Sequence, residues 1–161
     1  MRRVKLDKID RKILRDLQDN GRMPNVELAR RAGISAPPCL RRLRRLEDNG
    51  YIRGYHADIP PEHLGYGVTV FAHVGLNSQA EVDLAAFEAL VAEWPLVREC
   101  YMLTGEIDFI LKIVAEDMDG YNTFLTGTLT AAPNVSHVKS MLSIRSSKNE
   151  VGVPIDVDRV D

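Results

Sequence analysis

The spacing of apolar residues predicts three short helices at the start of the chain. The first helix begins after Asp7, whose carboxylate suits an N-cap, and stops at Asn20-Gly21. The second opens with Asn25 as its cap and stops at Gly33, and the third begins after Ser35. Two helices, a tight turn and a third helix form the order of a helix-turn-helix.

The residue pattern of the third helix predicts that one side is buried and the opposite side is cationic. Leucines at helical spacing, with Cys39 among them, are expected to pack on the first two helices. Guanidinium groups on the opposite side suit the major groove, where arginine binds phosphate or guanine. Arginine-rich faces are often only solvated, so this interpretation also depends on the preceding helices and the turn. The inward set is Leu40, Leu43 and Leu46; the outward set is Pro38, Arg41, Arg42 and Arg45, with Arg44 at the flank.

After the third helix the pattern predicts a change of module. Residues 50–55 are expected to form a short β-wing or hinge strand, and residues 57–66 carry the prolines and glycines of a linker. We therefore place a winged helix-turn-helix domain at residues 1–56.

The second half of the chain alternates between strand and helix patterns. Period-two alternation predicts strands near residues 68–76, 97–104, 109–115 and 138–145, with helical stripes after the first and third strands. This βαββαβ order predicts a ferredoxin-like domain at residues 67–146, and the whole chain is α+β. The tail, residues 147–161, is expected to dock as an extra strand or to stay loose.

Two helices cover only one face of a four-stranded sheet, and the second face is also apolar. Ile110, Val114 and Met141 supply apolar side chains on that side. An uncovered apolar face favours a partner, so we expect two sheets to pair in a homodimer.

Charge separates the two modules. Residues 1–56 carry 15 Lys and Arg against 7 Asp and Glu, a net charge of +8, while the remainder has 6 against 16 and a net charge of −10. Only the first module is therefore expected to face a polyanion.

Composition narrows the class of protein further. An apolar content of 45 % is ordinary for a globular protein, and no apolar run suits a membrane span. Two isolated cysteines and four dispersed histidines predict neither disulfides nor a metal site, and no catalytic constellation is present. We expect a cytoplasmic protein that is not an enzyme and needs no cofactor.

An ordered set of motifs resembles the Lrp/AsnC family, the leucine-responsive and asparagine-responsive regulators. The resemblance runs from Leu6 to about Arg145 and implies a RAM-type second domain that binds an effector. It also implies dimers that assemble into tetramers or octamers. The motifs are Leu6-Asp7, Ile13-Leu14, Asn20-Gly21-Arg22, Glu27-Leu28-Ala29, Pro38 to Leu43, Leu46-Glu47, Gly50-Tyr51-Ile52 and Thr104 to Phe109.

The resemblance also implies site residues. It places DNA contacts within residues 35–45, and we expect them from Ser35, Pro38, Arg41, Arg42 and Arg45. Close relatives can carry an acidic residue at the position that matches Arg41. It places an amino-acid effector against the turn from Gly105 to Asp108, completed by a loop of another dimer. The effector set is Met102, Leu103, Thr104, Gly105, Glu106, Asp108, Asn134, Val135, Ser136 and His137.

The chemistry of this turn suits a free amino acid. Asp108 is expected to accept hydrogen bonds from the ammonium group, and backbone N–H groups near Gly105 are expected to donate to the carboxylate. Met102 and Leu103 are expected to contact the effector side chain, with leucine or another apolar amino acid as the effector. The alternative interpretation is that Glu106 and Asp108 are only polar hairpin residues.

Three other functions remain open. These alternatives are an effector-independent regulator, an ACT-like subunit of a metabolic enzyme, and an RNA-recognition module. The last needs exposed aromatic side chains on the central strands, where this chain is mainly aliphatic. The favoured partner is double-stranded DNA with palindromic or repeated half-sites.

Overall fold

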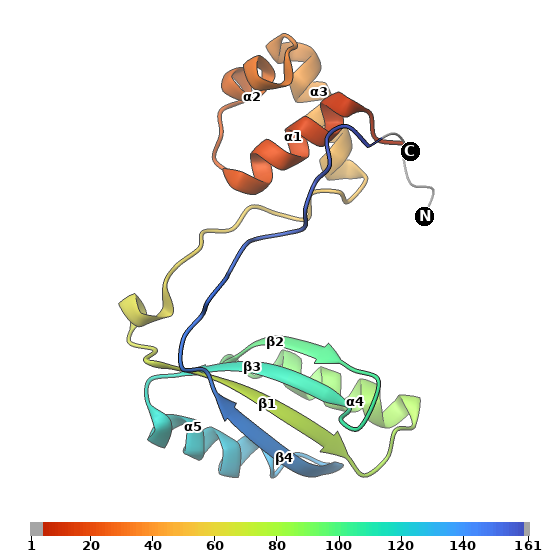
Figure 1. Cartoon of the computed structure of the whole chain (residues 1–161). Helices are drawn as coiled ribbons and strands as arrows, with labels where there is room; N and C mark the ends of the chain where they lie inside the picture. The colour runs from red at the N-terminus through yellow and green to blue at the C-terminus, as the bar shows by residue number, and fades with distance from the viewer. Residues whose placement is uncertain (1–4, 160–161) are drawn as a thin grey trace. The chain divides into compact units, whose positions relative to one another are not determined.

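The computed structural model describes residues 5–159, which form two compact units (Figure 1). The first unit contains the described residues up to Asp58 together with those from Lys148 onward. The second unit is Ile59–Ser147. The chain therefore passes between the units twice.

The first unit is built on three helices, as the apolar spacing predicts. They are α1 (Lys8–Asp19), α2 (Asn25–Ala32) and α3 (Ala36–Asp48). Asp7 caps α1 and forms a capping box with Asp10. Gly33 ends α2 at a φ of 78°, a left-handed conformation that glycine adopts without the steric cost of a Cβ.

Asn25 has a different role from the predicted one. It is the first residue of α2 rather than its cap, and its Nδ2 donates a 2.9 Å hydrogen bond to the carbonyl oxygen of Ala36. The side chain thus fastens the start of α2 to the start of α3 across the turn.

The predicted wing strand is wrong. Residues 50–55, all of them described, form a turn and an extended segment with no place in a sheet. Tyr55 holds the segment instead, because its hydroxyl donates to a carboxylate oxygen of Glu47 at 2.8 Å. A short segment without a paired strand gains little from β propensity alone.

The second unit has the predicted βαββαβ order. Its antiparallel sheet has the strand order β2-β3-β1-β4, so β1 lies between β3 and β4. The fourth strand begins three residues earlier than predicted. The elements are β1 (Val68–Leu76), α4 (Glu81–Ala92), β2 (Val97–Met102), β3 (Phe109–Ala115), α5 (Met118–Phe124), a π-helical turn (Leu125–Leu129) and β4 (Val135–Leu142), preceded by a 3-10 turn (Pro61–Leu64).

Both helices of this unit pack on the same face of the sheet. Phe87 of α4 lies 4.8 Å from Phe109 of β3 between ring centroids, and Trp94 lies 5.7 Å from Phe124 of α5. Alternate residues of β1 and β3 complete this core. The other face of the sheet has no covering element among the described residues of the unit, as predicted, but Val114, one of the three apolar residues expected on that face, is only 8 % exposed.

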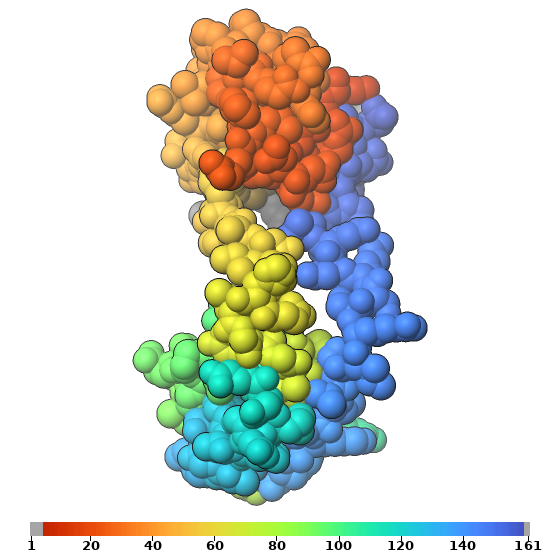
Figure 2. All heavy atoms as spheres, turned by 90° about the vertical axis from the view of Figure 1, so that its left-hand side faces the viewer, coloured from red at the N-terminus to blue at the C-terminus, as the bar shows by residue number. Residues whose placement is uncertain are grey.

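The described part of the C-terminal tail, residues 147–159, does not add a strand. Val153 exchanges two hydrogen bonds with the side-chain amide of Gln18 in α1, of 2.9 and 3.1 Å. Asp158 forms an ion pair with Lys8. Figure 2 shows the blue tail against the red atoms of α1, so the described tail from Lys148 onward belongs to the helical unit.

Candidate DNA-binding surface and effector-binding turn

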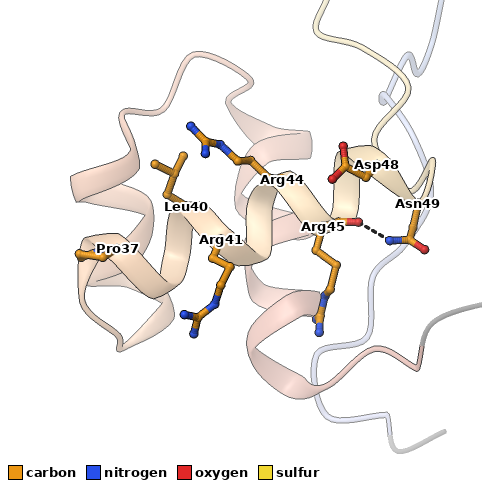
Figure 3. Close-up of a pocket in the computed structure, with 7 residues that line it drawn as sticks. All are labelled: Pro37, Leu40, Arg41, Arg44, Arg45, Asp48 and Asn49. Carbon is orange, nitrogen blue, oxygen red and sulfur yellow. Dashed lines mark hydrogen bonds between the residues drawn. The ribbon is translucent and has the colours of Figure 1, made fainter.

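The outer side of α3 carries a cationic hollow. Cys39 and Leu46 are fully buried beneath it, and Leu43 packs at the edge of the same core. Figure 3 shows the guanidinium groups of Arg41 and Arg44 extending from this outer side. The hollow measures about 630 Å³ and is lined by Pro37, Leu40, Arg41, Arg44, Arg45, Asp48 and Asn49.

The predicted assignment of inward and outward residues is partly wrong. Leu40 was expected in the core, but its side chain is 38 % exposed. Arg42 was expected on the outer side, but it is half-buried. The physical reason is that Cys39 occupies the centre of the packing face, and residues three and four positions further along a helix share that face. Leu40 is turned away from that face, and Arg42 is turned towards it.

Arg42 and Arg45 are held by one buried carboxylate. Asp10 is 1 % exposed and accepts from Arg42 Nη1 at 2.8 Å and from Arg45 Nη2 at 2.6 Å. Arg42 Nη1 also donates to Asp7 Oδ2 at 2.7 Å. The N-terminus of α1 is therefore tied to the middle of α3.

These contacts favour the charged forms of Asp7 and Arg42. Partial burial raises the pKa of Asp7, but the Asp10 amide and the Arg42 guanidinium outweigh it and leave that pKa below its usual value. The hydrogen bond to Asp10 raises the pKa of Arg42. Both arginines thus fix the position of α3 within the unit, and Arg45 still lines the hollow with a side chain that is 42 % exposed.

The other three residues predicted to contact DNA, Ser35, Pro38 and Arg41, differ in their exposure to solvent. Arg41 is exposed on the hollow, and Ser35 is exposed at the N-cap position without a side-chain capping bond. Pro38 is half-buried and does not line the hollow. Arg44, placed only at the flank by the sequence, lies on the hollow. Its spacing from Pro37, Leu40 and Arg41 is itself helical, which is the signal that identifies this face.

Asp108 is a buried acceptor at one end of the sheet. It is 8 % exposed, and its Oδ2 accepts the backbone N–H of Leu76 at 2.7 Å. Its Oδ1 accepts Gln79 Nε2 at the same distance. The carboxylate therefore holds the β1–α4 loop against the β2–β3 turn. Sequence reasoning missed Gln79, because no pattern in the chain pairs it with Asp108.

Asn134 holds the other side of the same loop. Its side-chain amide accepts from Ser78 N and donates to Ser78 O, both at 3.0 Å, with a left-handed φ of 67°. Because β1 lies between β3 and β4, residues 108 and 134 meet the loop from opposite sides. One subunit thus brings the two predicted parts of the effector site to one end of its sheet.

The other predicted effector residues near this end of the sheet differ in their exposure and contacts. The side chains of Met102 and Leu103 are 58 % and 40 % exposed, so they are accessible to a ligand. Gly105 has a left-handed φ of 124°, while Thr104 and Glu106 are exposed beside it. Of the remaining three, Val135 packs against the core, Ser136 is exposed, and the imidazole of exposed His137 lies against Gly75.

Family models match both units. The chain matches a winged helix-turn-helix DNA-binding domain over residues 6–53 and an Lrp/AsnC ligand binding domain over residues 69–153. The leucine-responsive regulatory protein of Rhizobium meliloti is 54 % identical over 153 residues, covering 95 % of this chain and 98 % of that protein. The chain belongs to the Lrp/AsnC family.

Further relatives agree with this assignment. The Bkd operon transcriptional regulator of Pseudomonas aeruginosa is 43 % identical over 89 % of this chain and 94 % of that protein. A transcriptional regulator of Neisseria meningitidis, solved as a complex with L-Met, matches with a TM-score of 0.89 and 39 % identity over 94 % of this chain and 97 % of that one. An AsnC family regulator of Agrobacterium tumefaciens gives a TM-score of 0.88 and 32 % identity over 96 % of this chain and all of that one.

This Lrp/AsnC protein is therefore a DNA-binding transcriptional regulator with an amino-acid-binding domain, and its relatives are regulators rather than enzymes. Within residues 5–159 no helix is both long and apolar enough to cross a bilayer. In the same range no group of three or more His, Cys, Asp or Glu side chains is placed to hold a metal ion.

Proposed function

We propose that this regulator binds duplex DNA through the outer face of α3, with Arg41 and Arg44 as its principal cationic contacts. The observation that carries the proposal is that these two arginines lie exposed on the hollow, whereas Arg42 and Arg45 are bound to Asp10. Arg45 contributes a weaker contact from the rim. Arg42 acts by positioning the helix. Ser35 is a further contact at the start of α3, where a helix N-terminus favours phosphate.

Removing both exposed arginines should weaken DNA binding strongly. Each phosphate contact contributes roughly 0.9 to the slope of log affinity against log salt, so the Arg41→Ala/Arg44→Ala double variant should lose about two from that slope. We expect roughly a hundredfold lower affinity for a selected duplex at moderate salt, measured by fluorescence anisotropy. Arg98→Ala, an exposed arginine of β2, is the matched control and should leave both quantities unchanged. An unchanged slope in the double variant would exclude this face.

The second part of the proposal is an apolar amino acid as effector at the end of the sheet where Asp108 and Asn134 meet. The regulator of known structure that carries L-Met supports this class of ligand. The exposed Met102 and Leu103 suit an apolar side chain, and methionine joins leucine as a candidate. The effector would act by binding two assemblies or DNA geometries with different affinity, since only a differential affinity shifts a population.

The third part is a homodimer that pairs the open sheet faces. Phe71 pairs with Met141 and Tyr101 with Ile110 across this face. On this face Lys112 and Glu99 neutralise each other in an ion pair of 2.8 Å, and the Lys112 hydrogen bond holds the pKa of Glu99 below its usual value. A twofold dimer would present two copies of α3 to two half-sites. The family resemblance extends this to tetramers or octamers.

A charge on the open face should dissociate the dimer. Phe71→Lys places an unpaired ammonium in the proposed interface, and a buried unpaired charge costs several kcal/mol, roughly a hundredfold or more in dissociation constant. Sedimentation velocity should show monomers at concentrations where the unsubstituted chain is assembled. Val82→Lys, on an exposed position of α4, is the control and should sediment as the parent does. If Phe71→Lys stays assembled, the dimer uses another surface.

The proposed DNA partner indicates the cellular compartment in which the protein acts. The named relatives are bacterial, and bacterial chromosomes lie in the cytoplasm, so we propose that the protein acts there.

A further inference from the structure

The first turn and a half of α3 carries no long polar side chain. Its first five residues are Ala36, two prolines, Cys39 and Leu40, and the first arginine follows at Arg41. In helix-turn-helix proteins the N-terminal residues of this helix are the ones that contact base edges. This regulator therefore places methyl and methylene groups where others place hydrogen-bonding side chains.

Leu40 is the accessible member of this apolar segment. Cys39 is fully buried, whereas Leu40 is 38 % exposed and lines the hollow with Pro37. Figure 3 shows Leu40 on the outer side of α3, between Pro37 and Arg44. An exposed leucine that shares a hollow with Arg41, Arg44 and Arg45 fits an occupant that is anionic around an apolar point.

Duplex DNA offers one such point in the major groove. The edges of adenine, guanine and cytosine present hydrogen-bond donors and acceptors there, while thymine adds an apolar 5-methyl group. Phosphates flank every base, so Arg41 and Arg44 complement the charge on either side.

We propose that Leu40, supported by Pro37, reads the 5-methyl group of a thymine in each half-site. The inference rests on the proposed binding of α3 to DNA and adds the base feature that the apolar part of the helix recognises. Sequence preference at that position then depends on apolar contact rather than on a bidentate hydrogen bond.

A chemical double-mutant cycle tests the contact. A duplex bound by the parent protein is first selected from a random pool, and each thymine of a half-site is then replaced by deoxyuridine, which removes only the methyl group. One position should lose roughly fourfold in affinity, the value for burial of one methyl-sized group. Leu40→Ala should bind the thymine and deoxyuridine duplexes equally, because the partner of the methyl group is gone.

Two further variants make the result specific. Leu40→Met keeps an apolar contact and should retain most of the preference for thymine. Leu64→Ala removes an exposed leucine from the second unit and should keep the full preference. Circular dichroism of each variant checks that the helices are formed.

The outcomes separate this inference from the proposed function. If the parent protein selects no duplex, DNA binding by α3 itself fails. If it selects a duplex that tolerates deoxyuridine at every position, or if Leu40→Ala keeps the preference, only the role of Leu40 is overturned.

Discussion

Replacing Asp10 by alanine should lower the stability of the helical unit far more than any surface substitution in that unit. Asp10 is 1 % exposed and accepts hydrogen bonds from Arg42, Arg45 and the Asp7 backbone N–H. Loss of the buried carboxylate removes the acceptor of Arg45 and leaves Arg42 with Asp7 alone, although both arginines reach solvent and so recover part of their hydration. We expect the free energy of unfolding to fall by about 3 kcal/mol.

The two units can be followed separately in this experiment. Trp94 is the only tryptophan and packs in the core of the second unit, so its fluorescence reports on that unit. Far-ultraviolet circular dichroism includes the helices of the first unit. In urea, the Asp10→Ala variant should lose helical signal early while the Trp94 transition stays in place. DNA affinity should fall with it, because α3 is no longer anchored.

A matched acid on the same helix provides the control. Asp19 is exposed at the end of α1, and Asp19→Ala should leave both transitions within about 0.5 kcal/mol of the parent. An Asp10→Ala protein as stable as Asp19→Ala would show that the two arginines are held by other contacts.

Replacing Asp108 by alanine should affect both the second unit and its ligand. The substitution leaves the buried N–H of Leu76 and the amide of Gln79 without their acceptor, which costs about 2 kcal/mol. The Trp94 transition should therefore shift to lower urea. Amino-acid binding, measured by calorimetry against leucine and methionine, should be lost because the β1–α4 loop is released.

A second substitution separates positioning from charge. Asp108→Asn keeps an oxygen that can accept from Leu76 but removes the negative charge. If the carboxylate binds the effector ammonium, this variant should fold like the parent and bind at least tenfold more weakly. If it only positions the loop, affinity should be close to that of the parent.

The control for both variants is Asp119→Ala, an exposed acid in the first turn of α5. It should leave amino-acid affinity unchanged. Unaltered affinity in Asp108→Ala would remove this turn from effector binding.

Local signals predicted most of the fold. The capping box of Asp7, the left-handed stop at Gly33 and the period of two in the strands are set by residues close together in the chain. The predicted wing strand does not form because residues 50–55 satisfy a strand pattern but have no partner strand. Strand pairing depends on segments that are distant in the chain.

The candidate sites were also predicted only in part from the sequence. The sequence identified α3, Asp108 and Asn134, because a cationic helix and polar turns are local patterns. It did not orient α3 correctly, since Leu40, Leu43 and Leu46 recur every three residues and therefore drift around a helix of 3.6 residues per turn instead of sharing one narrow face. Packing of Cys39 on the other helices selects one rotation, exposes Leu40 and brings Arg42 to Asp10.

The sequence by itself determined the helix-turn-helix, the βαββαβ order and the division of charge between the two halves, because period, capping and composition act over short stretches. Only the tertiary structure decided which arginines of α3 remain exposed, that Gln79 binds Asp108, and that the tail returns to α1. Each of these depends on residues separated by 29 to 135 positions in the chain, which come together only when the chain folds into its two units.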